Sequence, residues 1–206
     1  MKTVLRLALA LLSLAAFTAV ASAAPVKYTI DKAHTEVGFD IRHFFSKVHG
    51  RFNDFQGTLV FDDKTPANIS VDASAATTSI WTDNDRRDNH LRSADFFDAE
   101  KNPTLTFKST KVTANGKNKY KVAGDLTLRG VTKPVVFDAE FLGAGEVAAG
   151  GQSMGSKAGF TATTTINRQD YGIKWNKALD NGGMMLDDNV TIVLNIEGNQ
   201  VQDEKK

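Results

Sequence analysis

The densest concentration of charge in this chain lies in residues 83–97, which read DNDRRDNHLRSADFF. The segment holds four aspartates, three arginines and a histidine, side chains that could bind an anion, hold a metal ion or pair with one another. A guanidinium group pairs bidentately with phosphate and also donates to neutral oxygens. Arg86, Arg87 and Arg92 are therefore candidates to contact the polar head of a ligand.

The same segment also has a purely structural interpretation. Asp83 can serve as the N-cap of a helix of about two turns. Alternating signs then suit the local ion pairs Asp85–Arg86 and Asp88–Arg92, each contributing about 0.5 kcal/mol at a surface. We expect a short helical lid or rim over one end of the fold.

Catalytic chemistry has little support in the sequence. No G-x-S-x-G motif occurs, and Ser153 in GQSMG lies in a glycine-rich stretch. The histidines His34, His43, His49 and His90 have no H-E-x-x-H spacing. A metal-dependent envelope hydrolase that uses His34, His43, His90 and nearby aspartates is kept as an alternative, and neither catalytic nor metal-ligating residues are assigned.

Two further polar segments flank expected strands. After the strand that ends in INRQDYGIKW, Arg168 and Asp170 are expected to pair and to fix a turn at Gly172. Tyr171 and Trp175 have apolar rings and polar tips, which suit the mouth of a barrel or a plug at its end.

Near the start of the fold, Asp31 and His34 are expected to form a turn through hydrogen bonds from side chain to backbone. His43, Phe44 and Phe45 interrupt the alternation of the next strand. We expect a kink there that directs aromatic rings inwards.

The first residues have the features of a secretory signal. Lys2 and Arg6 precede the uncharged apolar run of residues 7–20, and Ala21–Ser22–Ala23 provides an A-x-A cleavage site. We predict a cleaved secretory signal peptide over residues 1–23 and one mature, secreted domain over residues 24–206.

Composition narrows the classes of partner. The chain has no cysteine, which excludes disulfides, thiolate catalysis and cysteine-ligated metals. Its 25 basic and 24 acidic residues balance, so no net charge directs it to nucleic acid or to an anionic membrane. No segment after the signal is apolar enough to insert stably in a bilayer. We expect no cofactor, and a monomer or a homodimer.

Alternation with a period of two dominates the rest of the chain. It is clearest in PVVFDAEFLG, GFTATTTINR and NVTIVLNIEG, and hairpin turns are expected at Asn115–Gly116 and near Gly130. The glycine-rich residues 142–156 are expected to be a variable hairpin loop. About eight antiparallel strands must bury their apolar faces in a sandwich or a closed barrel.

Many inward positions of these strands hold Ala, Val and Thr, which favours a hollow interior over a filled one. A filled barrel that acts as a stress or partner-binding protein has the same alternation and is the other alternative.

Four segments resemble, in order and in spacing, the YceI-like family of exported lipid-binding proteins. They are YTIDKAHTEVGFDIRHFFSKVHGRFNDFQGTLVFDD, DNDRRDNHLRSADFFDAEKNPTLTFKS, GDLTLRGVTKPVVF and INRQDYGIKW. The resemblance implies an all-β, lipocalin-like antiparallel barrel that carries or sequesters a polyisoprenoid, an isoprenoid quinone or a similar long-chain amphiphile. It also implies a periplasmic or secreted location and a binding role in place of catalysis.

The residues expected to contact such a ligand are mostly apolar and inward-facing, with arginines and aromatic rings at the mouth. They are Val37, Phe39, Phe44, Arg86, Arg92, Phe97, Phe107, Leu126, Leu128, Phe137, Phe160, Arg168, Trp175, Ile192 and Leu194.

Overall fold

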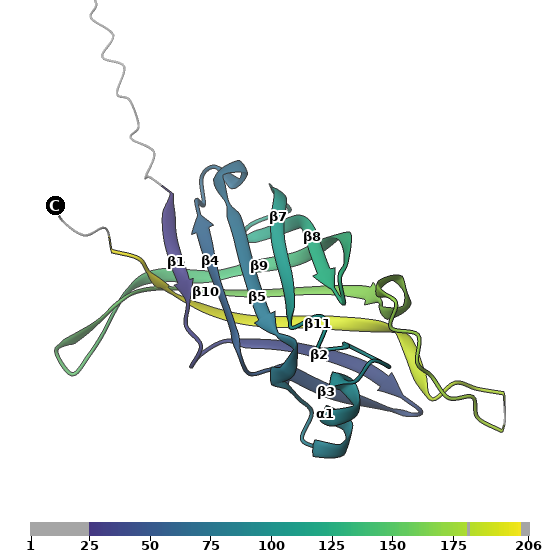
Figure 1. Ribbon diagram of the computed structural model, residues 1–206. Helices are drawn as coiled ribbons and strands as arrows, with labels where there is room; N and C mark the ends of the chain where they lie inside the picture. Colours follow the sequence, from purple (N-terminus) through teal and green to yellow (C-terminus); the bar gives the residue numbers. More distant parts are fainter. Residues whose placement is uncertain (1–24, 181, 203–206) are drawn as a thin grey trace, which may run out of the picture.

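A computed structural model describes residues 25–180 and 182–202 (Figure 1). The signal peptide predicted over residues 1–23 lies outside the described residues and stays a prediction. The strands are β1 (Val26–Ile30), β2 (Glu36–His43), β3 (Ser46–Phe52), β4 (Phe55–Phe61), β5 (Ser70–Ala76), β6 (Ile80–Trp81), β7 (Thr104–Ala114), β8 (Lys119–Leu128), β9 (Val131–Ala149), β10 (Gln152–Asn167) and β11 (Leu186–Gln200). The α-helix is α1 (Asp85–Arg92), and the short 3₁₀ turns are η1 (Pro66–Asn68), η2 (Thr77–Ser79) and η3 (Arg168–Tyr171).

The strands form a closed antiparallel barrel, as predicted. Eight of them follow one another in the order β1-β4-β5-β7-β8-β9-β10-β11, and pairing of β1 with β11 closes the circle. Tyr28 of β1 lies opposite Gln200 of β11 at this seam. Closure leaves no free sheet edge along the seam, which removes a site for edge-to-edge association.

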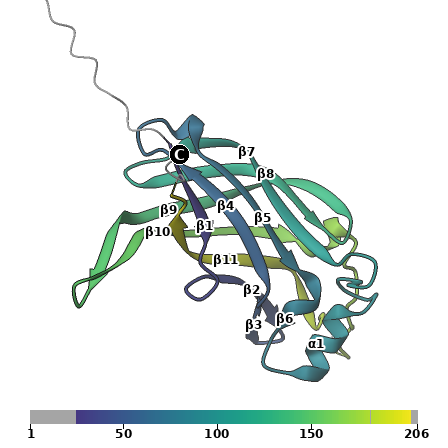
Figure 2. The same cartoon turned by 60° about the vertical axis from the view of Figure 1, so that its left-hand side comes forward.

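The long strand β11 pairs with two different strands along one of its edges. The C-terminal part of β11 pairs with β1, whereas its N-terminal part pairs with β2 from Asn195↔Glu36 to Leu186↔His43. β2 then pairs with β3, and β3 with the short β6. At the end of the barrel nearest α1, the wall is therefore extended by a branch, β2–β3–β6, with α1 beside it (Figure 2).

Alternation along the strands places apolar side chains inside. In β8, the inward positions Tyr120, Val122, Leu126 and Leu128 are buried. At the end of the barrel farthest from α1, aromatic rings pack tightly: the ring centroid of Phe61 lies 5.1 Å from that of Phe160 and 5.9 Å from that of Tyr120. This aromatic cluster lines the interior at that end.

The hairpin predicted at residues 142–156 is present, but most of it is paired strand and not loop. Strand pairing continues through this stretch to Gln152↔Ala149, so β9 and β10 form an arm that projects from the barrel (Figure 2). Gly150 and Gly151 both have positive φ, 60° and 80°, which allows a two-residue turn. Because that turn preserves the backbone hydrogen bonds of both strands, the ladder extends beyond the barrel wall.

Among residues 25–180 and 182–202, no helix is long and apolar enough to cross a membrane.

Candidate ligand-binding cavity

The barrel encloses a cavity of about 870 Å³. Its walls come from most of the barrel strands, from β2 and β3 of the branch, and from α1 and the segment after it. A volume of this order lies within the range of about 300–1,000 Å³ that is usual for small-molecule sites.

Thirteen of the fifteen predicted contact residues line the cavity. These are Val37, Phe39, Arg86, Phe97, Phe107, Leu126, Leu128, Phe137, Phe160, Arg168, Trp175, Ile192 and Leu194. Phe44 and Arg92 lie outside the lining.

Two glycines make room for aromatic rings on the cavity wall. A Cβ atom on Gly50 would lie 2.3 Å from Cζ of Phe39, the residue opposite it in the ladder. A Cβ atom on Gly124 would lie 2.5 Å from Cζ of Phe107. Both distances are far below van der Waals contact. The two phenylalanine rings therefore lie flat against the wall only because these positions have no side chain.

Helix α1 covers the cavity at the end of the branch. Its N-cap is Asn84, whose Oδ1 accepts a hydrogen bond from the Arg87 backbone N–H at 2.9 Å. Asp83, the predicted N-cap, instead has a left-handed φ of 60°. Asn84 is the cap because its extended backbone directs its side chain at the free N–H groups of the first helical turn.

The charged side chains of α1 bind the barrel wall more than one another. The Thr82 hydroxyl donates to the buried carboxylate of Asp88 and accepts from Nε of Arg87 at 2.7 Å. Arg92 donates from Nε to the Thr78 carbonyl and from Nη2 to the Ile80 carbonyl, both at 2.8 Å. The predicted Asp88–Arg92 pair was thus wrong, because both partners are engaged by the wall beneath the helix.

Arg86 differs from its neighbours. It is exposed at the rim of the cavity, and its guanidinium has no hydrogen bond or ion pair with any described residue. His90 lies at the same rim, where its ring centroid is 4.8 Å from that of Trp175 and its Nε2 is 2.9 Å from the Asp95 carboxylate. Of the three candidate arginines, Arg86 is the one whose guanidinium is free to meet a ligand, since Arg87 and Arg92 are bound to the wall.

Arg168 lines the cavity but is fully committed inside the protein. It is 3% exposed, and Nη1 donates to the Ile173 and Trp175 carbonyls at 2.9 and 2.7 Å. Its carboxylate partner is Asp188 at 2.9 Å, and the predicted pair with Asp170 was wrong. The left-handed Gly172 (φ 74°) turns the chain so that carbonyls and Asp188 surround the guanidinium.

Tyr171, the last residue of η3, is also buried, at 2% exposed, in an apolar cluster with Leu126 and Leu128 of β8. Burial, with a smaller effect from the Asp170 carboxylate, raises the pKa of Tyr171 to about 12. The phenol is therefore neutral over the physiological range and acts as part of the wall support.

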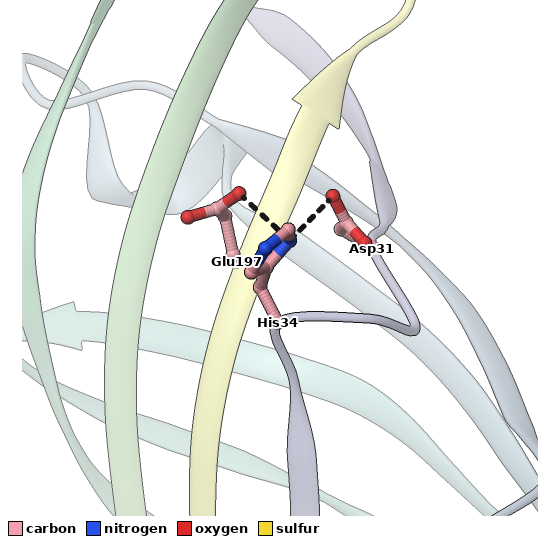
Figure 3. Close-up of side chains that lie close together, drawn as sticks. All are labelled: Asp31, His34 and Glu197. Atoms are coloured by element: carbon pink, nitrogen blue, oxygen red, sulfur yellow. Dashed lines mark hydrogen bonds and ion pairs between the residues drawn. The ribbon is translucent and has the colours of Figure 1, made fainter.

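The histidines named for a metal site do not converge. His43 and His90 lie at the cavity, whereas His34 lies outside the lining, between Asp31 and Glu197 (Figure 3). His34 Nδ1 is 3.2 Å from Asp31 Oδ2 and 3.6 Å from Glu197 Oε1. Among the described residues, this is the one cluster of at least three ligand-type side chains close enough to share an ion.

That cluster already contains a cation. Lys157 Nζ lies 3.0 Å from Glu197 Oε1 and 3.4 Å from Asp31 Oδ2. The hydrogen bond that Lys157 donates to the Glu197 carboxylate is the largest of the effects that raise the pKa of Lys157. A lysine ammonium already placed against both carboxylates makes this an ion-pair network that joins β10, β11 and the β1–β2 turn.

Burial would raise the pKa of the Asp31 carboxyl, but hydrogen bonds outweigh that effect and hold the pKa well below its ordinary value. The donors are His34, the Ala33 N–H, Asn199 and Lys157. The bond from the Ala33 N–H, at 2.9 Å, confirms the turn predicted for Asp31 and His34.

Several cavity residues were not singled out from the sequence. They are Phe52, Phe55, Leu59, Phe61, Val71, Leu91, Met185 and Leu186. A weaker alternation in residues 57–63, GTLVFDD, is the pattern that could have indicated Leu59 and Phe61. Met185 and Leu186 follow an irregular stretch without periodicity, so no pattern indicated them.

The closed barrel with an apolar interior and a helical cover defines a β-barrel protein with a ligand-sized cavity. The sequence model of the YceI-like domain matches residues 28–198, and the chain belongs to this family. It is 42% identical over 187 residues to a UPF0312 protein of Pseudomonas aeruginosa, covering 89% of this chain and 92% of that protein.

Solved structures agree with the fold. The crystal structure of the Campylobacter jejuni YCEI protein is 34% identical, with a TM-score of 0.64 over 84% of this chain and 96% of the other. A polyisoprenoid binding domain from Saccharophagus degradans has a TM-score of 0.61 over 85% of this chain and 99% of the other at 12% identity, a similarity of fold alone.

Proposed function

We propose that this protein binds one long-chain amphiphile of the polyisoprenoid type, with its tail in the barrel and its polar head at the rim near Arg86. The observation that carries the proposal is the apolar cavity of about 870 Å³ that opens beside an unpaired arginine. The S. degradans domain of similar fold, which is named for polyisoprenoid binding, supports the same class of ligand.

The binding free energy would come mainly from the tail. Each Å² of apolar surface removed from water contributes about 25 cal/mol, so affinity depends on the length of tail that the cavity accepts. Arg86 adds a charge-assisted hydrogen bond to a phosphate or another polar head. We expect α1 and the segment that carries Trp175 to influence the rate of ligand release, because both border the rim.

The role that fits this chemistry is that of a carrier or a reservoir in the bacterial periplasm. Export rests on the signal-like residues 1–23. Reversible burial of a tail in a water-soluble barrel would let an insoluble lipid cross an aqueous compartment.

The cavity can be tested by filling it. Ala139 of β9 lines the cavity, and its neighbour Glu140 is exposed on the outer face. Ala139→Trp should lower the affinity for a fluorescent polyprenol at least tenfold in a titration, whereas the control Glu140→Trp should leave it unchanged. Equal affinities for a folded Ala139→Trp protein and the wild type would reject the placement of the tail.

A further inference from the structure

Beyond the cavity rim, backbone hydrogen bonds join three neighbouring segments: the β2–β3 tip, the residues just before β11, and the residues around Lys177. The Met185 N–H donates to the Lys177 carbonyl at 2.9 Å, and the Phe44 N–H donates to the Met185 carbonyl at 3.1 Å. Leu186 lies opposite His43 in the β11–β2 ladder, and both line the cavity. Figure 1 shows the β2–β3 tip and the loop before β11 at the same end of the barrel. The outer surface of these segments is therefore continuous with the entrance to the cavity.

The tip of the β2–β3 hairpin presents an aromatic ring to solvent. Phe45 is 103% exposed, so the expectation that its ring points inwards was wrong, and no other phenylalanine among the described residues is classed as exposed. Its neighbour Phe44 has a φ of 51°, a left-handed conformation that is rare for a bulky residue. Two-residue hairpin turns favour Asn and Gly. A turn made of two phenylalanines, one of them strained and the other fully exposed, therefore indicates a function at the tip.

The neighbouring loop adds a second apolar side chain and positive charge. Met184 is 53% exposed. Lys47, beside the hairpin tip, and Lys177, beside Met184, are exposed and have no ion pair with any described residue. The described residues of segments 43–48 and 174–186 hold three lysines against the single carboxylate of Asp180.

The carboxylates that follow this loop are neutralised. Asp187 accepts from Arg42 Nε at 3.1 Å, and Asp188 is bound by Arg168 at 2.9 Å. The exposed surface at this end of the sheet thus combines apolar side chains with unpaired lysines.

We propose that Phe45, Met184, Lys47 and Lys177 form a docking surface for an anionic phospholipid bilayer. Phe45 and Met184 would insert at the level of the head groups, and the two lysines would contact lipid phosphates. This inference rests on the proposed function, because docking in this orientation turns the cavity entrance towards the lipid from which a tail would enter. It requires no membrane-spanning segment.

The charges argue against a second copy of the chain as the occupant. A two-fold interface sets the same surface patch of both copies against itself. The two lysines would then face their own counterparts with Asp180 as the nearby carboxylate, whereas an anionic lipid surface neutralises them.

The test is co-sedimentation of the mature chain with vesicles of phosphatidylglycerol and phosphatidylcholine in equal parts, compared with phosphatidylcholine alone. We expect at least tenfold tighter binding to the anionic vesicles. Phe45→Ser with Met184→Ser should weaken that binding at least tenfold. The matched control is Leu142→Ser with Met154→Ser, which removes side chains that are 61% and 56% exposed on the β9–β10 arm, and it should bind like the wild type.

The charge contribution is tested in the same assay. Lys47→Gln with Lys177→Gln should reduce binding to anionic vesicles about tenfold, while Lys111→Gln with Lys117→Gln, near the opposite end of the barrel, should not. The proposal would be overturned if the wild type did not bind anionic vesicles. It would also be overturned if the Phe45→Ser/Met184→Ser and Lys47→Gln/Lys177→Gln proteins both bound them as the wild type does. A wild-type dimer in analytical ultracentrifugation that Phe45→Ser converts to monomer would overturn it too, since the surface would then bind a second copy.

The experiments distinguish a failure of the membrane-docking proposal from a failure of the lipid-binding proposal. Ala139→Trp, which fills the cavity, should still sediment with anionic vesicles. A protein that binds vesicles but contains no extractable lipid when purified would contradict the proposed function and remain consistent with the docking surface. A purified protein that contains bound lipid but does not bind vesicles would contradict the docking surface and remain consistent with the proposed function.

Discussion

Nη2 of Arg168 donates a hydrogen bond to Oδ1 of Asp188 at 2.9 Å and thereby ties the end of β10 to the start of β11. The same guanidinium holds the carbonyls of Ile173 and Trp175, so it positions the segment that brings Trp175 to the cavity rim. One buried side chain thus supports a part of the wall that no strand ladder holds.

Removing this group should destabilise the protein markedly. Arg168→Ala leaves buried carbonyls without donors, and we expect a loss of about 3 kcal/mol in the free energy of unfolding. Urea denaturation followed by circular dichroism measures it. The control is Arg42→Ala, which removes the exposed pair with Asp187 and should cost less than about 1 kcal/mol. Equal losses for the two variants would contradict the structural role of Arg168.

Two arginines of α1, Arg86 at the cavity rim and Arg92 outside the cavity lining, should separate the effects on binding from those on stability. Arg86→Ala removes an unpaired guanidinium, so it should weaken binding of a polyprenyl phosphate about tenfold, or about 1.4 kcal/mol, without changing stability. Arg92→Ala removes hydrogen bonds to the Thr78 and Ile80 carbonyls and should cost about 2 kcal/mol of unfolding free energy. Isothermal titration and urea denaturation of both variants give the comparison; an Arg86 variant with full affinity would remove that residue from the head-group site.

The ion-pair network at the barrel seam predicts a pH dependence. Because the pKa of Asp31 is lowered in the folded state, the unfolded chain takes up the proton first as pH falls. The stabilisation is therefore complete above the ordinary aspartate pKa of about 4 and is lost as pH falls through the lower folded value.

Asp31→Asn should accordingly lower the unfolding free energy near neutral pH, and the difference from wild type should shrink between about pH 5 and pH 2. Urea denaturation across that range measures it. Asp72→Asn, at an exposed position of β5, should show no such trend. If the difference in unfolding free energy between the two proteins stayed constant with pH, the hydrogen bonds to Asp31 would not lower its pKa as described.

Much of the barrel could be predicted because alternation directly reports which face of a strand is buried. Val190, Ile192, Leu194 and Ile196 were expected on one face of the last strand, and all four line the cavity. The turn at Asn115–Gly116 was also correct, since Gly116 adopts a φ of 115° between β7 and β8. These features depend on neighbours in the sequence.

The polar partners of the site could not be predicted in the same way. Arg168 pairs with Asp188 after a long excursion of the chain, not with Asp170 two positions away. Arg92 binds backbone carbonyls, which every residue offers and no sequence pattern marks. The division of β11 between β1 and β2 likewise depends on the course of the closed barrel, because alternation specifies faces and not partners.

The most direct test of lipid binding is native mass spectrometry of the protein purified from the bacterial envelope without detergent, followed by solvent extraction. We expect one added mass per chain that is released into organic solvent and matches a polyisoprenoid-type lipid. The Ala139→Trp protein, prepared identically, should lack that mass. A wild-type protein that carries no lipid, and that also fails to take one up from added polyprenol, would contradict the proposed function.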